Sequence, residues 1–260
     1  MKRSTKRTLT RSGFYLLLVA AIAGAALTVN WSRVRANFWS NGLKGNWHDL
    51  IFTGVVKTLE YTAICFGVGL ALALVVALMK MSPIGPYRWI ATAYIELFRG
   101  LPALIVIFAC AFGVPIAFSW QPPGGLVGAG LLGLIMVCAA YMAETLRAGI
   151  QAVPKGQEEA ARSLGMSNAR TLFSVVLPQA FRIVTPPLTN ELILVVKDSS
   201  LAYIIGLSST SFDLTKYGRD LANTNANLTP LVIAGLCYLV ITLPLTFAVR
   251  RMEAKTARAR

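Results

Sequence analysis

Long apolar runs constrain this chain more than any other feature of its sequence. A helix that crosses a bilayer needs roughly 20 mostly apolar residues, and six stretches reach or approach that length. They are residues 14–29, 55–79, 89–118, 126–146, 184–207 and 228–249. The runs do not alternate between apolar and polar residues, as spanning strands would. Helices therefore remain as the spanning structure, because they satisfy every backbone hydrogen bond internally.

The composition supports an integral membrane protein. Hydrophobic residues make up 55% of the 260 residues and charged residues only 14%, whereas a soluble domain carries about 25% charged residues. This excludes a cytosolic enzyme and a disordered chain. The net charge of +14 does not indicate a nucleic-acid binder, because lysine and arginine gather on the cytoplasmic side of membrane proteins. The four cysteines lie singly in apolar runs and form no metal-binding motif.

The basic residues predict the orientation. Most of them lie before the first run, after the last run and in the connection between the fourth and fifth runs. With six spans, both termini and that connection are therefore expected in the cytoplasm. The first run is short, and its basic start and small residues at 23–26 also fit a cleaved signal peptide. Cleavage would leave five spans without changing the orientation of the others.

The connection over 147–182 is unusually long for a link between helices. Within it, Pro154 favours the start of a helix, Glu158 suits the first turns, and Gly165 favours its end. Ala160, Ala161 and Leu164 stand at helical spacing. These residues predict a short helix outside the membrane with a compact apolar face. Such a helix can dock another protein or rest on lipid.

This segment resembles the EAA loop of ABC importer permeases. Glu159-Ala160-Ala161, then Gly165, Val175 and Leu177-Pro178, keep the spacing of that loop, with Val175 in a position where isoleucine is usual. Two further stretches resemble the polar amino acid permeases, the group for histidine, glutamate, glutamine and arginine. They are E-L-F-R-G-L-P at 96–102 and N-E-L-I-L-V-V-K-D-S-S-L at 190–201.

The resemblance implies an all-α membrane protein, a five- to six-helix transmembrane bundle with a cytoplasmic coupling helix at 154–167. The expected organisation is a basic amino terminus with an extra helix and external segment at 1–53, a permease domain at 54–253 and a basic tail at 254–260. The implied function is the transmembrane subunit of an ATP-driven importer of polar amino acids in the bacterial inner membrane. The implied ATPase-coupling residues are Glu158, Glu159, Ala160, Ala161, Leu164 and Gly165.

The same resemblance implies partners. Two ATPase subunits would carry ATP and magnesium, a second permease subunit, identical or homologous, would complete the path, and an extracellular or periplasmic binding protein would deliver the amino acid. Membrane lipid surrounds the bundle. No cofactor and no catalytic site are expected on this chain, which lacks the GxxxxGK[ST] phosphate-binding loop.

Charges within the third and fifth runs mark the expected substrate path, because such charges are costly and usually face a cavity. Asn190 and Lys197 share one helical face, and Glu191 and Asp198 share another. Groups of both signs can hold the ammonium and carboxylate of an amino acid, or they can pair internally. The candidate path residues are Glu96, Arg99, Asn190, Glu191, Lys197, Asp198 and Ser199.

Two other functions remain open from the residues alone. A secondary transporter or channel would work without an ATPase and would show matching interrupted repeats, which this sequence lacks. A structural scaffold has no need for three charges in its fifth run. The sequence does not identify the amino acid.

Overall fold

The computed structural model describes residues 3–35, 48–120, 122–205, 212–224 and 227–258, and every regular element among them is a helix. This confirms the expected all-α fold. The expected external segment at 36–47, residues 206–207 of the fifth run and the last two residues of the basic tail lie outside the described residues.

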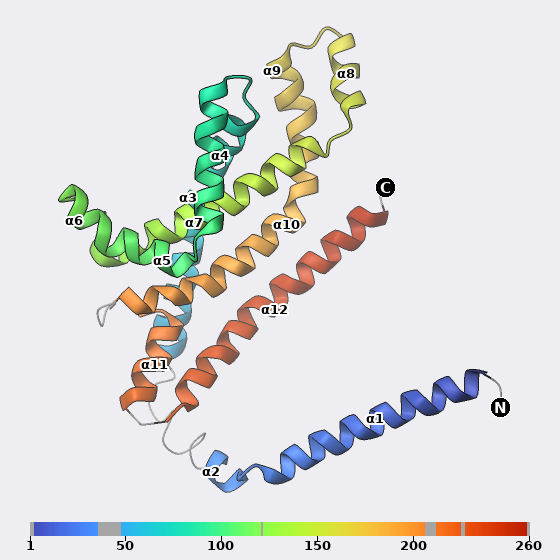
Figure 1. The fold of residues 1–260 in the computed structure, drawn as a ribbon, viewed down its shortest axis with the longest axis vertical. Helices are drawn as coiled ribbons and strands as arrows, with labels where there is room; N and C mark the ends of the chain where they lie inside the picture. The colour runs from blue at the N-terminus through green and yellow to red at the C-terminus, as the bar shows by residue number, and fades with distance from the viewer. Residues whose placement is uncertain (1–2, 36–47, 121, 206–211, 225–226, 259–260) are drawn as a thin grey trace.

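The first apolar run forms α1 (Arg3–Thr28), which is followed by the short α2 (Trp31–Arg35). Figure 1 shows α1 separated from the other long helices. Its large apolar side chains, including Leu16 and Leu17 at 70% exposed, contact no core. The apolar part, Gly13–Thr28, is shorter than the other apolar helices. Lipid or another chain must therefore cover this helix.

Three helical stretches in the described residues are long and apolar enough to cross a membrane. Asp49–Met81 consists of a π-helical turn (Asp49–Val55) and α3 (Val56–Met81). The others are α7 (Gly125–Gln151) and Thr229–Ala254 of α12 (Thr229–Arg258). These stretches match the second, fourth and sixth apolar runs of the sequence.

The third run is not the single continuous span that its composition suggests. It divides into α4 (Gly85–Gly100) and a second helix, Ala103–Phe118, which is bent by 109° relative to the first. The second helix comprises α5 (Ala103–Phe108), a π-helical turn (Ala109–Gly113) and α6 (Val114–Phe118). Pro102 disfavours helical geometry in the preceding residue, and Leu101 is accordingly extended with φ −93° and ψ 141°.

The fifth run begins earlier than expected. After α8 (Lys155–Ser163), the chain forms α9 (Asn168–Thr171), a π-helical turn (Leu172–Val176) and α10 (Leu177–Asp198). Helix α10 contains Pro186 and Pro187 and three charges near its end, and it is not among the helices apolar enough to span by length and composition. A 3₁₀ segment (Ser199–Ile205) and α11 (Leu214–Thr224) complete the chain before α12.

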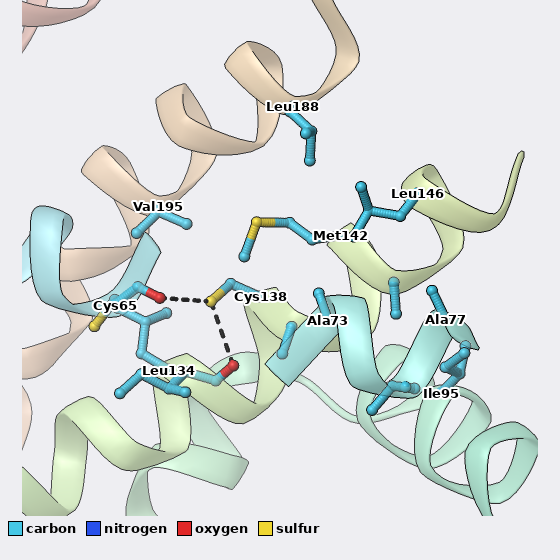
Figure 2. Close-up of a cluster of buried hydrophobic side chains, with 14 of the residues drawn as sticks. Cys65, Ala73, Ala77, Ile95, Leu134, Cys138, Met142, Leu146, Leu188 and Val195 are labelled. Carbon is cyan, nitrogen blue, oxygen red and sulfur yellow. Dashed lines mark hydrogen bonds between the residues drawn. The ribbon is translucent and has the colours of Figure 1, made fainter. Parts of the chain in front are cut away.

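Small residues allow the helices of the bundle to approach closely. The main core joins α3, α4, α7 and α10 and includes Ala73, Ala77, Cys138 and Met142 (Figure 2). A Cβ atom on Gly69 of α3 would lie 2.6 Å from Sγ of Cys138 on α7. The Cys138 thiol donates to the carbonyl oxygens of Cys65 and Ile135 at 3.4 and 3.3 Å. The contact between α3 and α7 therefore depends on a missing side chain, as is common in membrane bundles.

We expect Gly133→Ala to destabilise the bundle by about 1–3 kcal/mol, because its added Cβ meets backbone that has no room to move. That Cβ would lie 2.8 Å from Cα of Ile107 in α5. Gly67→Ala is the matched control, since nothing lies within 4 Å of the Cβ it would add. Thermal unfolding in detergent should show a lower midpoint for the first variant alone. Equal midpoints would contradict the close contact between α5 and α7.

Candidate functional site: a charged pocket and an exposed helix

A pocket of about 460 Å³ opens where the α4–α5 break faces α7 and α10. Four side chains of α7 line it at helical spacing, and four of α10 line it with the same spacing. Those residues are Leu134, Val137, Cys138 and Tyr141 of α7, with Glu191, Leu194, Val195 and Asp198 of α10. The wall is completed by residues 99–103. A broken helix and two intact ones thus create a cavity of the size that binds small molecules.

Arg99 supplies the positive charge of this pocket. It lies in the last turn of α4, two residues before the extended Leu101, and its guanidinium carbon lies 5.4 Å above the ring centre of Tyr141. The sequence spacing allows Arg99 to pair with Glu96, but no such ion pair occurs among the described residues. Glu96 is exposed and does not line the pocket. The guanidinium is held by an aromatic face instead, which leaves its donors free to meet a ligand.

Glu191 and Asp198 supply two negative charges. Both are half-buried and line the pocket, as their shared helical face predicts. Neither carboxylate forms an ion pair among the described residues. Asn190 and Lys197 share the other face, as expected, but they are exposed and lie outside the pocket. Of the four candidates on α10, the fold therefore brings only the two acids to the pocket.

Ser199 follows the pocket residue Asp198 in the chain, but its side chain lies in a different environment. Its side chain is fully buried, and its hydroxyl donates to the carbonyl oxygen of Val196 at 2.8 Å. It does not line the pocket. Ser199 therefore belongs to the packing that fixes the end of α10 rather than to the cavity wall.

Sequence reasoning overlooked Cys138 and Tyr141 as pocket residues. Tyr141 lies seven residues after Leu134 and thus on the same face of α7. An aromatic residue in that position was the available signal, but the sequence does not show which face of an apolar helix meets a cavity. Among the described residues, no three His, Cys, Asp or Glu side chains gather to hold a metal ion.

An ion cluster ties α3 to α7 beyond the pocket. The Glu144 carboxylate accepts from Nζ of Lys80 at 3.2 Å and from Nε of Arg147 at 3.1 Å. Glu144 and Arg147, three residues apart on α7, form an ion pair, and Lys80 of α3 also pairs with Glu144. All three side chains are at most a quarter exposed, so screening by water is reduced and the cluster can fix the two helix ends.

Helix α8 lies at the end of the molecule opposite α11 (Figure 1). Pro154 precedes its first residue, and Gly165 follows its last turn with φ +79°. The amide of Met166 donates to the Ala161 carbonyl at 3.2 Å, and the amide of Gly165 donates to the Arg162 carbonyl at 2.9 Å. These two bonds form the Schellman ending that favours glycine. The sequence therefore predicted both ends of this helix correctly.

The expected apolar stripe on α8 divides into two faces. Ala161 is buried against the rest of the chain, while Ala160 is exposed and Leu164 is 85% exposed. Glu158, Glu159 and Gly165 are exposed as well. A side-chain hydrogen bond of 3.3 Å from Gln179 to Gln157 ties α8 to α10. The helix is thus anchored on one side and presents a large apolar side chain on the other, as a docking surface does.

A second cleft, of about 470 Å³, lies between α8 and the α9 segment. Lys155 and Glu158 line it from α8, and Asn168 and Thr171 line it from α9. Thr171 is only 2% exposed, and its hydroxyl has no hydrogen-bond partner in the part of the chain that the structure describes. A buried, unpartnered hydroxyl reduces stability.

Comparison with known proteins identifies the fold. Residues 66–258 match the family of binding-protein-dependent transport system inner membrane components. The chain belongs to this family. It is therefore the permease subunit of an ABC transporter, a multi-pass membrane protein whose ATPase is a separate subunit and whose partners include a binding protein.

Relatives of the permease cover most of its length. The arginine transport system permease protein ArtQ of Bacillus subtilis is 37% identical over 205 residues, which are 79% of this chain and 91% of ArtQ. The L-cystine transport system permease protein TcyB of the same organism is 36% identical over 185 residues, 71% of this chain and 73% of TcyB.

Solved structures agree with this assignment. A crystal structure of an amino acid ABC transporter with histidines has a TM-score of 0.71 and 35% identity, over 81% of this chain and 95% of its own. The MetNI methionine ABC transporter, in an inward-facing form, has a TM-score of 0.67 at 22% identity and supports the fold alone.

For the permease we expect Thr171→Val to raise the free energy of unfolding by about 1 kcal/mol, because it removes a buried hydroxyl that lacks a partner. Thr62→Val is the control. Its hydroxyl is also buried but donates to the Thr58 carbonyl at 2.7 Å, so the same substitution should lower stability. Denaturation in detergent compares the two. A loss of stability in Thr171→Val would show that this hydroxyl has a partner in the native protein.

Proposed function

We propose that the permease imports a polar amino acid, and that the substrate is a cationic one such as arginine. The observation that carries this proposal is the pocket formed by Arg99, Glu191 and Asp198. Two carboxylates face one guanidinium there, so the pocket has an excess of negative charge. The substrate carboxylate can pair with Arg99, while its ammonium and its cationic side chain can pair with the two acids.

The cost of these charges supports a functional role. An acid or base near the middle of a membrane helix costs about 2.5–3.5 kcal/mol on insertion scales. The Glu144 carboxylate offsets its cost through Lys80 and Arg147. Glu191 and Asp198 lack such partners among the described residues, so a cationic ligand would relieve their burial. The similarity to the arginine permease ArtQ points the same way.

The exposed face of α8 is the proposed docking surface for the ATPase. A groove of the ATPase subunit would receive the exposed residues Glu158, Glu159, Ala160, Leu164 and Gly165. The buried Ala161 would pack α8 against the rest of the permease. Two ATPases that close on ATP would draw two such helices together. The bond between Gln157 and Gln179 offers a direct route from α8 to α10, which carries both pocket acids.

Transport then requires two packings of the bundle whose balance depends on the nucleotide. ATP binding can favour one packing only through contacts that differ between the two states. The α4–α5 break is a suitable hinge, because its residues already lack continuous helical bonding. We place both termini and α8 in the cytoplasm of a bacterial cell, with α11 facing the binding protein outside. A second permease subunit would cover the exposed faces, including those of Asn190 and Lys197.

The pocket predicts a difference between two otherwise matched substitutions. Glu191→Gln should reduce uptake of a cationic amino acid about 10- to 100-fold, because a hydrogen bond to a charged group contributes about 1.5–3 kcal/mol. Glu96→Gln, on the exposed side of α4, should transport like the wild type. Uptake into proteoliposomes that contain the complete transporter measures both. Unchanged uptake by Glu191→Gln would remove this carboxylate from the substrate path.

The α8 surface predicts a second matched pair. Gly165→Val should release the ATPase. A β-branched residue at φ +79° costs about 1–2 kcal/mol of conformational energy, so the end of α8 should change its conformation. Gly165→Asn should retain it, since asparagine tolerates this conformation. Co-purification and substrate-stimulated ATP hydrolysis provide the readout.

Three outcomes would contradict the coupling proposal or the orientation that it needs. A Gly165→Val complex with full coupled ATPase activity would exclude α8 as the docking surface for the ATPase. Import at full rate in the absence of any ATPase would instead favour a secondary transporter. Labelling of Ser167 from outside the cell would overturn the orientation on which both predictions rest.

A further inference from the structure

Asp213 is a buried carboxylate that neither the pocket nor α8 explains. It is 0% exposed, and it is the only fully buried aspartate or glutamate among the described residues. It directly precedes α11, at the end of the molecule opposite α8 (Figure 1). It lies outside the apolar spanning stretches.

Among the described residues, the carboxylate accepts hydrogen bonds from neutral donors alone. The amide of Lys216 donates to Oδ1 at 3.0 Å, and the amide of Thr215 donates to Oδ2 at 3.4 Å. The hydroxyl of Tyr238, from α12, donates to Oδ2 at 3.4 Å. Asp213 therefore caps the amino terminus of α11 and also links this helix to α12.

Tyr238 also contacts Thr215, and two more elements pack around the start of α11. Its hydroxyl lies 3.1 Å from the hydroxyl of Thr215, and the segment that begins at Ser199 contacts both α11 and α3. Thr58, on α3, also accepts from the amide of Leu214 at 3.1 Å. We call Asp213, Thr215, Tyr238, Thr58 and Ser199 the α11 latch. It joins α3, α11, α12 and the segment that begins one residue after the pocket acid Asp198.

The cations of α11 and the charged pair of α3 have partners other than Asp213. The ammonium of Lys216 pairs with Asp220 and lies 5.2 Å above Phe212, and the guanidinium of Arg219 lies 4.8 Å above Tyr203. Lys57 and Glu60 pair with each other on α3. Other titratable groups on the elements around α11 include Asp49, Tyr61, Lys197, Asp198, Tyr217, Cys237 and Tyr238. No cation therefore pairs with Asp213 among the described residues, and its burial raises its pKa to about 6.

We propose that Asp213 is a proton-binding site that sets the strength of the α11 latch. The closed latch buries this carboxylate, and opening exposes it to water. Its pKa would then fall towards the ordinary value of about 3.9. The closed state binds the proton more tightly, so acid pH favours the closed latch. Stabilisation is complete below the lower pKa and is lost as the pH rises through about 6.

The consequence for transport is that acid slows any step that separates α11 from α12. Such a step would move Ser199 and, with it, the end of α10 that carries Asp198. The latch therefore connects the face proposed to meet the binding protein with the pocket. The proton site itself rests only on the packing around Asp213, so it stands or falls independently of the substrate.

Hydrogen exchange of α11 amides in the complete, detergent-solubilised transporter tests this site. After correction for intrinsic exchange, the wild type should gain about tenfold protection between pH 7.5 and 5, since one pKa unit is a tenfold change in equilibrium. Asp213→Asn imitates the protonated acid, so its α11 should be well protected and independent of pH. Asp220→Asn is the matched control on the same helix, with a side chain that is 41% exposed in the wild type, and should respond like the wild type.

Three results would overturn the proposal. They are a wild type whose α11 protection does not change with pH, an Asp213→Asn variant that keeps the wild-type response, and an Asp220→Asn variant that loses it. If Asp213→Asn does not fold, a comparison of Tyr238→Phe with the wild type tests the proposal instead. It removes one donor that favours the ionised carboxylate, so the midpoint of the protection change should move to higher pH. A midpoint that stays in place would exclude Asp213 as the titrating group.

Discussion

Backbone hydrogen bonding in a medium without water is the constraint on which this structure depends. Every amide and carbonyl within the hydrocarbon must find a partner inside its own helix, which explains why all regular elements among the described residues are helical. The constraint also makes an interruption costly. The break at Leu101 and Pro102 is therefore informative, because it ends α4 inside the bundle and places Arg99 at the wall of a cavity.

Close packing then fixes the helices around that break. Hydrophobic burial does not drive helices together in lipid, so contact depends on small residues and on specific polar bonds. The small residues include Gly69, Gly133 and Ala139. One of the polar bonds is the hydrogen bond that the Tyr94 hydroxyl donates to the Met136 carbonyl at 2.8 Å. Because α7 contacts α3, α4, α5 and α10, it is the element against which the others are positioned.

The acids of this permease differ mainly in what surrounds them. Glu144 is paired with two cations and can tie helices together. Glu191 and Asp198 face a cavity, in a position to meet a ligand. Asp213 is enclosed by neutral donors at the opposite end from α8. The same chemical group can thus serve structure, binding or proton uptake, and the choice depends on partners and on access to water.

The sequence by itself determined the fold class, the three continuous spanning stretches, both ends of α8 and the shared helical face of Glu191 and Asp198. These features depend on local propensity and on the helical period, which a single chain segment carries. Only the tertiary structure decided that the third run is broken by 109°, that Ala161 faces inward while Leu164 faces outward, and that Lys197 and Glu96 lie outside the pocket. It alone revealed Tyr141 beneath Arg99 and Tyr238 beside Asp213. Such contacts join residues 25 or more positions apart in the chain, and periodicity within one helix contains no information about which neighbour its face will meet.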